Sequence, residues 1–247
     1  MKVSIIIPCY NSEKWIDKCV RSALDQSYED TEVILVDNES TDDSPTIVKE
    51  IAKEYEDLIL SSAPNIHPNC WDEAREVGMK LATGDYMLTM GSDDFLAPYF
   101  IERCSNFIRV VKKYDEVLAI QSPILGISDS MPHNGRMQMH AYSSVESFKE
   151  QCLAHCPVNT PSVLFHRSLF EEGMLSTLPE KYGGAADYDL YCRLADKNIF
   201  IHPCSDWLGY HYRWHKDQAT WRVLSESVDY NSKIQSYWRS KWRDTTV

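Results

Sequence analysis

The sequence predicts an α/β fold in which a mostly parallel β-sheet is flanked by helices. In the first half of the chain, short apolar runs rich in β-branched residues alternate with segments whose apolar residues recur at helical spacing. This alternation is typical of a parallel sheet built with right-handed crossovers. Polar clusters follow three of the expected strands, and ligands of such sheets bind beyond the carboxyl ends of the strands.

Local patterns predict the elements of the first half. Residues 3–7, rich in Val and Ile, are typical of a strand buried on both faces. Asn11 or Ser12 is expected to cap a first helix, and Ser44 a second, with Pro45 at its first helical position. The other expected elements are strands at 32–36, 58–60 and 86–90 and helices at 70–82 and 98–113.

The second half of the chain is less regular. Residues 126–144, rich in Ser, Met, His, Asn and Gly, are expected to form a long mobile loop. The expected elements are strands at 117–121 and 162–165 and helices at 187–195 and 225–243. The sequence has no internal repeat and no low-complexity linker, so a single domain is expected.

Composition and charge narrow the class of protein. The chain of 247 residues is 43% hydrophobic and 25% charged, which is ordinary for a soluble globular protein. The net charge of −12 argues against nucleic-acid binding. Without a signal peptide or a membrane-length apolar run, we expect a cytoplasmic protein with reduced cysteines. A zinc site is an alternative, although the spacing of its possible ligands is weak evidence. These ligands are Cys152, His155, Cys156, His202 and Cys204.

Asp93 and Asp94 are the most informative residues. Two adjacent carboxylates that follow a buried strand repel each other and are costly to desolvate, and a divalent cation relieves both costs. Oxygen ligands suit Mg²⁺ or Mn²⁺, and a cation held there could bind a diphosphate. The alternative is that one of the two aspartates caps the helix expected at 98–113.

Three polar clusters are expected to meet at one edge of the sheet. They are 8–11, Asp37-Asn38 and 91–94, each at the end of an expected strand. Because carboxyl ends of parallel strands share an edge, these clusters should line one crevice. An acidic protein that binds an anionic nucleotide there needs a local cation. The sequence therefore predicts a nucleotide site.

Six motifs in order resemble those of family 2 glycosyltransferases with a GT-A fold, over about residues 1–220. They are Val3–Asn11, Val36–Asp42, the Ala74-Arg75 to Gly78 and Ala82–Tyr86 segment, Gly91–Asp94, Ala186–Leu190 and Tyr212-Arg213-x-His215. The resemblance implies a Rossmann-like, mostly parallel sheet and an irregular C-terminal half that faces the acceptor. We expect a single domain, 1–247, with three parts. Residues 1–120 form the half that binds the nucleotide sugar, 121–220 form the half that faces the acceptor and carries the base, and 221–247 form a closing helix.

The family resemblance also implies an inverting, single-displacement transfer from a nucleotide-diphosphate sugar to a hydroxyl of a glycan or lipid-linked acceptor. Asp187 is expected to be the base, although it could instead cap the helix that follows it. Asp93 and Asp94 are expected to divide the Mn²⁺ or Mg²⁺ and ribose contacts, with His215 as a third metal ligand. A UDP-sugar is the favoured donor, and GDP- and dTDP-sugars are alternatives. The residues expected to contact the nucleotide sugar are Pro8, Tyr10, Asn11, Asp37, Asn38, Arg75 and Asp93.

Four positions depart from the family pattern: Asn38, Glu76, Gly91 and Ala186. Asn38 replaces an acidic residue and still offers an amide carbonyl to a base. These departures motivate one alternative, a degenerate nucleotide- or glycan-binding module. A transferase that uses polyprenyl phosphate is another.

The segment 225–243 carries tryptophans among basic residues. Such a helix can lie on an anionic membrane surface, which predicts peripheral contact with the inner face of the membrane. The alternative is a helix that packs on the domain and keeps its basic groups in water.

Overall fold

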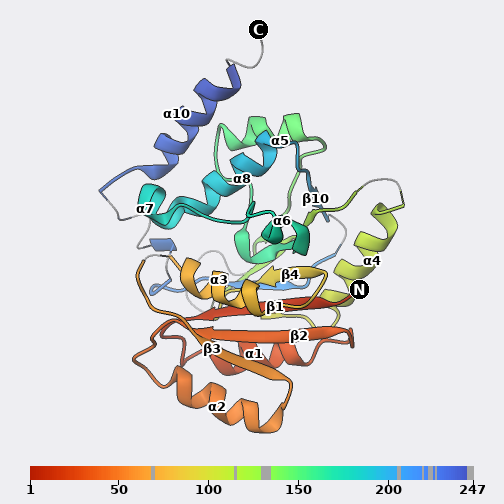
Figure 1. Cartoon of the computed structure of the whole chain (residues 1–247), viewed down its shortest axis with the longest axis vertical. Coiled ribbons are helices and arrows are strands. Elements are labelled where there is room, and N and C mark those ends of the chain that lie inside the picture. The colour runs from red at the N-terminus through yellow and green to blue at the C-terminus, as the bar shows by residue number, and fades with distance from the viewer. Residues whose placement is uncertain are drawn as a thin grey trace.

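The computed structural model describes residues 1–67, 70–113, 116–128, 135–204, 207–218, 220–221, 225 and 227–243 (Figure 1). The elements of its first half are β1 (Val3–Cys9), α1 (Ile16–Leu24), β2 (Thr31–Asp37), α2 (Ser44–Glu54), β3 (Leu58–Ser62), α3 (Asp72–Leu81), β4 (Tyr86–Thr89), β5 (Phe95–Leu96) and α4 (Phe100–Val111). Every strand and helix expected in this half is present, and the short strand β5 was not expected.

The expected helix caps are wrong. The residue before α1 is Trp15, and neither it nor Asp43 before α2 caps its helix with a side chain. Ser12 and Ser44 instead bind each other across the loops, since the Ser12 amide donates to the Ser44 hydroxyl over 2.8 Å. The Ser44 side chain therefore holds the β1–α1 loop to the start of α2, a long-range contact that a local capping rule does not predict.

The second half contributes strands to both sheets of the molecule. Its elements are β6 (Ala119–Gln121), β7 (Ile124–Ile127), β8 (Met137–Gln138), α5 (Val145–Cys152), the 3₁₀ turn η1 (Thr160–Ser162), β9 (Val163–His166), α6 (Arg167–Glu171), α7 (Pro179–Tyr182), the 3₁₀ turn η2 (Gly183–Ala185), α8 (Ala186–Asp196), β10 (Ile201–Pro203), β11 (Tyr210–Arg213) and α10 (Tyr230–Arg243). The described part of the loop expected at 126–144 holds the end of β7 and all of β8. Strands this short leave no periodicity, and 129–134 lie outside the described residues.

The main sheet has seven strands in the order β10-β6-β9-β4-β1-β2-β3. Strand β1 lies inside the sheet and pairs in parallel with β2 and β4, while β9 is antiparallel to both β4 and β6. The sheet is therefore mostly parallel, as expected. All seven residues of β1 are buried, because helices cover both faces of the sheet.

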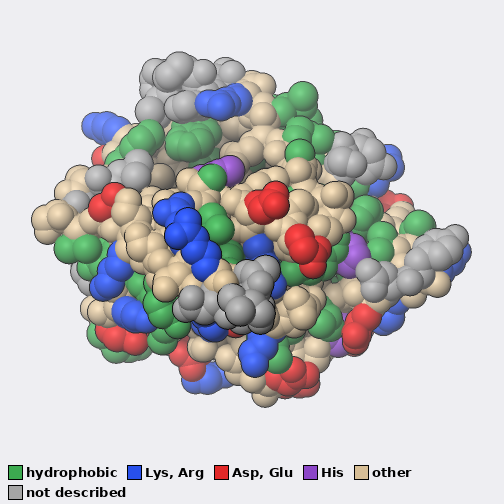
Figure 2. Space-filling view, turned by 90° about the horizontal axis from the view of Figure 1, so that it is seen from above, with side chains coloured by type: hydrophobic (Ala, Val, Ile, Leu, Met, Phe, Trp, Pro, Cys, Tyr) green, Lys and Arg blue, Asp and Glu red, His purple; other side chains and the backbone are tan. Residues whose placement is uncertain are grey.

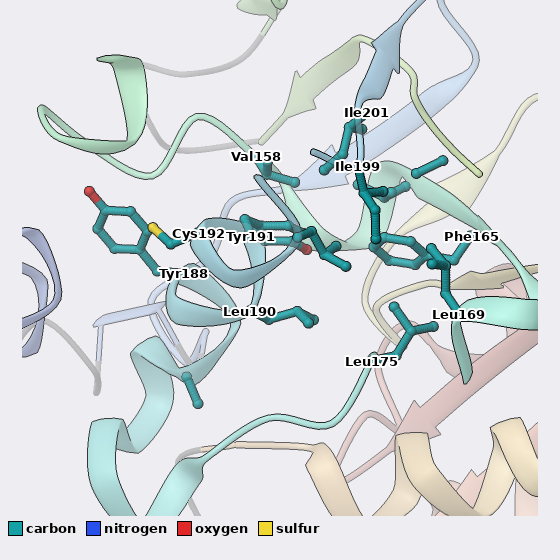
Figure 3. Packing of buried hydrophobic residues seen from close by; sticks show 14 of the residues in the cluster. Val158, Phe165, Leu169, Leu175, Tyr188, Leu190, Tyr191, Cys192, Ile199 and Ile201 are labelled. Atoms are coloured by element: carbon teal, nitrogen blue, oxygen red, sulfur yellow. The ribbon is translucent and has the colours of Figure 1, made fainter. Parts of the chain in front are cut away.

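Alternate residues of β1 enter two different hydrophobic clusters. Ile5 and Ile7 pack with α1, α2 and α4 on one face, whereas Ile6 faces the cluster that includes α3 and α8. Figure 3 shows part of this second cluster, in which Leu190 and Tyr191 of α8 lie near Phe165 of β9. Helix α8 is thereby fixed against the sheet.

A second sheet brings two distant segments together. Its order is β5-β11-β7-β8, with Tyr210 of β11 paired with Leu96 of β5 and with Ile124 of β7. Strand β5 directly follows Asp93 and Asp94, and β11 is followed by His215. Pairing of the two strands therefore carries the end of the second half to the acidic pair.

Helix α10 lies at one end of the long axis, beside α7 and α8 (Figure 1). Ile234 and Trp238 are buried, and the Trp238 indole donates to Asp189 of α8 over 3.0 Å. Trp242 donates similarly to Asp196 over 3.0 Å. The apolar side of α10 is thus packed on the protein. Among the described residues, no helix is long and apolar enough to cross a membrane.

All eight cysteines are free thiols, and several are buried. Within the described ranges, no three or more His, Cys, Asp or Glu side chains form a group that could hold a metal ion. The zinc alternative therefore finds no support.

Gly78 of α3 packs closely against Ile6 of strand β1. A Cβ atom at this position would overlap the Cγ2 methyl of Ile6. We expect Gly78→Ala to lower the free energy of unfolding by about 1–3 kcal/mol, since overpacking outweighs the helix propensity of Ala. Urea unfolding measures the change. In an Ile6→Ala background most of this cost should vanish, and an equal cost in both backgrounds would contradict the packing explanation.

Candidate active site

A cleft of about 420 Å³ opens beyond the carboxyl ends of β1, β2 and β4. Each of the three expected polar clusters contributes to it, and so do the start of α8 and the segment that follows β11. Of the residues expected in the nucleotide-sugar, metal and base sites, those that line the cleft are Pro8, Tyr10, Asn11, Asn38, Asp93, Asp94, Asp187 and His215. The structure thus brings the expected base and the acidic pair to one cavity.

Asp94 is buried, and each of its carboxylate oxygens accepts a hydrogen bond from a protein donor. Its side chain accepts hydrogen bonds from the Tyr210 hydroxyl over 2.7 Å and from the Arg213 amide over 2.8 Å. Burial, and next the charge of Asp93, raise the pKa of Asp94 well above its ordinary value. Helix α4 starts only at Phe100, so neither aspartate caps it, and that alternative is wrong.

Asp93 faces His215 at the cleft. Its carboxylate lies 2.8 Å from Nε2 of His215, and the imidazole ring packs on Trp15 with centroids 4.0 Å apart. The Arg213 side chain donates to the Asp93 backbone carbonyl over 2.8 Å. The carboxylate is a ligand type that suits Mn²⁺ or Mg²⁺, and the imidazole is a ligand type of transition metals.

Gly91 explains one departure from the family pattern. A Cβ at this position would lie 2.7 Å from an Asp93 carboxylate oxygen and 2.9 Å from one of Asp94. A glycine leaves both carboxylates in their observed positions. The replacement is therefore compatible with an intact acidic pair.

Asp187 occupies the first turn of α8, which begins at Ala186, so it is not an N-cap. Its carboxylate accepts a hydrogen bond of 2.5 Å from the Thr160 hydroxyl and one of 2.8 Å from the Tyr188 amide. The Tyr191 hydroxyl in turn donates to the Thr160 oxygen over 2.9 Å. Burial raises the pKa of Asp187 above its ordinary value, and the Thr160 hydrogen bond opposes this shift.

Asp189, the rival carboxylate on the same helix, turns away from the cleft. It is 2% exposed and binds Arg193 and Trp238 over 2.9 Å and 3.0 Å. Residues two positions apart on a helix point to different sides. Asp189 therefore anchors α8, while Asp187 faces the cavity.

Two other expected contacts lie elsewhere. Asp37 does not line the cleft, and its carboxylate accepts the Ser40 amide over 3.3 Å in the turn after β2. Arg75 is buried, pairs with Asp72 over 2.7 Å and donates to the Leu175 carbonyl over 2.8 Å. Arg75 lines a smaller neighbouring cavity instead.

Several cleft residues had no signal in the sequence. Trp15 lies just before α1, Thr160 belongs to an irregular segment without a motif, and Trp214 is the unspecified position of the Tyr212-Arg213-x-His215 motif. Only long-range packing brings them to the cavity.

Comparisons with known proteins identify the family and the fold. The model of the family described as glycosyl transferase family 2 matches residues 4–173. A poly(ribitol-phosphate) beta-glucosyltransferase of Bacillus spizizenii is 37% identical over 109 residues, which cover 43% of this chain and 17% of that protein. The chain spans less than half the length of the first relatives it matches.

Two solved structures share the fold. S. aureus TarS 1–349 in complex with UDP-GlcNAc has a TM-score of 0.69 and 22% identity, covering 92% of this chain and 62% of that one. The mannosyltransferase PcManGT of Pyrobaculum calidifontis, in complex with GDP-Man and Mn²⁺, has a TM-score of 0.61 and 14% identity, covering 100% and 76%. On the family match and this shared architecture, the chain belongs to glycosyl transferase family 2 and has a GT-A fold.

Proposed function

We propose that the protein is an inverting, metal-dependent glycosyltransferase that moves a sugar from a nucleotide-diphosphate sugar to a hydroxyl of a glycan or lipid-linked acceptor. One observation carries the proposal: Asp187 and the Asp93–His215 pair line the same cleft of about 420 Å³. A base and a site for the leaving diphosphate are the two groups that such a displacement needs. The nucleotide sugar would then lie between them.

The nucleotide would bind at the ends of β1 and β2. Pro8, Tyr10 and Asn11 line this part of the cleft, together with Asn38. The amide oxygen of Asn38 is buried and, among the described residues, has no hydrogen-bond partner. It is available to accept a hydrogen bond from a base, which a UDP-sugar supplies through the uracil N–H. GDP and dTDP also carry a ring N–H, so donor trials should include them.

Asp93 and His215 would hold Mn²⁺ or Mg²⁺. Both carboxylate oxygens of Asp94 already accept hydrogen bonds from protein, so Asp94 fits a structural role better than that of a ligand. Two protein ligands leave the remaining positions of a cation to diphosphate oxygens and water. When bound, the cation would neutralise charge that develops on the leaving diphosphate.

Asp187 would accept the proton of the acceptor hydroxyl. As that proton moves to the carboxylate, the acceptor oxygen bonds to C1 of the sugar from the face opposite the diphosphate. The C1–O bond to the diphosphate breaks, and the configuration at C1 inverts. Thr160 holds the carboxylate in place, and Tyr191 holds Thr160. A raised pKa brings the base nearer to working pH.

The acceptor would enter beside the second half of the chain, 121–220, while 1–120 binds the donor and 221–247 closes the molecule. The name of the Bacillus relative, a poly(ribitol-phosphate) beta-glucosyltransferase, favours a polymer as acceptor. Figure 2 shows the face that carries α5 and α10, on which acidic and basic side chains are interspersed. Among the coloured atoms of this view, the basic side chains form no single patch. We propose a cytoplasmic location with peripheral membrane contact. Such contact would depend on scattered basic groups, because the tryptophans of α10 pack against the protein.

The first test removes the base. We expect Asp187→Asn to slow sugar transfer by roughly 10²–10⁴-fold while UDP binding stays unchanged. Transfer is followed as UDP or GDP released from a panel of nucleotide sugars with acceptor, and binding as a thermal shift. Asp217→Asn is the matched control, because Asp217 lines the same cleft with a side chain that is 54% exposed. Full turnover by Asp187→Asn would refute the assignment. No turnover by the native chain with any donor would favour the binding-module alternative.

The second test concerns the pKa of the base. The Thr160 hydrogen bond lowers the pKa of Asp187, so its removal in Thr160→Val should raise that pKa further. Activity requires the ionised carboxylate. The acidic limb of the kcat/KM profile should therefore move to higher pH in Thr160→Val and return in Thr160→Ser. A profile that keeps its midpoint while the rate falls would show a purely structural role for Thr160.

The third test addresses the metal. Mn²⁺ should increase the thermal stabilisation of the protein by UDP, because protein and diphosphate share the cation. Asp93→Ala and His215→Ala should each weaken this Mn²⁺-dependent part of UDP binding at least about tenfold. Asp217→Asn again serves as control. Equal Mn²⁺ dependence in all three variants would contradict the ligand assignment.

A further inference from the structure

A second cavity of about 30 Å³ lies directly beside Asp187. It shares Trp71, Thr89 and Asp187 with the large cleft and extends from there between α3, β9 and α8. A space of this size holds about two water-sized groups. The cavity is thus a side pocket of the candidate active site, too small for a sugar ring and large enough for a substituent.

Two buried hydroxyl groups line the pocket without a partner. The Oγ1 atoms of Thr89 and Thr177 are buried, and among the described residues neither makes a hydrogen bond. Buried polar groups are nearly always satisfied, so an unpartnered pair at one pocket calls for an explanation. A ligand atom that accepts a hydrogen bond would satisfy them.

The rest of the wall is mainly apolar. Phe165, Leu190 and Tyr191 all line the pocket, and Figure 3 shows them within the hydrophobic cluster between β9 and α8. Such a wall takes a methyl group more readily than a hydrated polar group. The pocket therefore combines hydrogen-bond donors with an apolar surface.

Charge argues that the bound group is neutral. Arg75 is the cation of the described lining, and it already pairs with Asp72 over 2.7 Å. Asp187 adds a second carboxylate to the same wall. A carboxylate substituent, as in a uronic acid, would meet two like charges against one cation.

The position of the pocket selects the sugar carbon. In an inverting displacement the base stands next to C1, and the ring neighbours of C1 are C2 and the ring oxygen. Only C2 carries a substituent, so the group that enters a pocket beside Asp187 is the C2 substituent. We propose that the pocket binds the acetyl part of a 2-acetamido group, so that the donor is a nucleotide-diphosphate 2-acetamido sugar. The carbonyl would accept from Thr89 or Thr177, and the methyl would contact the apolar wall. This inference rests on the proposed function.

The test compares UDP, UDP-glucose and UDP-N-acetylglucosamine, by calorimetry with Mn²⁺. The two sugars differ only at C2, so their ratio of affinities reports on the pocket, while UDP alone reports on the nucleotide cleft. We expect the acetamido donor to bind the native chain roughly tenfold more tightly than UDP-glucose.

Thr89→Val and Thr177→Val supply the decisive variants. Each replaces an unpartnered buried hydroxyl by a methyl of similar size, so the folded chain should keep or gain thermal stability. Each should reduce the preference for the acetamido donor several-fold and leave UDP affinity unchanged. Ser105→Ala is the matched control, since its buried hydroxyl is also unpartnered among the described residues but lies on α4, outside both cavities.

The outcomes separate the two proposals. If UDP binds but UDP-glucose binds as tightly as the acetamido donor, or both variants keep the native preference, the pocket assignment is wrong and the proposed function stands. If UDP itself fails to bind, the proposed function fails and the pocket assignment falls with it.

Discussion

The pairing of β11 with β5 is the constraint on which the candidate active site depends. It brings Tyr210 and the Arg213 amide, which lie 116 and 119 residues beyond Asp94 in sequence, to the Asp94 carboxylate. A buried carboxylate without such donors would be strongly destabilising, so the pairing and the buried acid support each other. The same pairing carries His215 to Asp93. One short antiparallel contact thus assembles the diphosphate end of the cleft.

This arrangement gives two adjacent aspartates different surroundings. Asp94 points inward, where protein donors use both of its oxygens, and Asp93 points to the cleft and His215. Gly91 leaves the space that both carboxylates occupy. Asp94 therefore stabilises the site from within, while its neighbour Asp93 faces the space where a ligand would bind.

Helix α8 shows the same division at the opposite wall. Asp187 faces the cleft, and Asp189 is fixed from behind by Arg193 and by the Trp238 indole of α10. The closing helix therefore anchors the element that carries the proposed base. The tryptophans of α10 therefore have a structural role in packing against α8, and membrane contact is not needed to explain them.

The sequence by itself determined the α/β class, the elements of the first half and the family, because strands buried on both faces and amphipathic helices leave strong periodic patterns. It also identified Asp93, Asp94, Asp187 and His215 as residues of one cleft. Only the tertiary structure decided that Asp37 and Arg75 lie outside that cleft and that Thr160 and Trp15 lie at it. Those positions depend on contacts between distant segments, on strands of two residues and on loops, none of which has a period that a sequence can display.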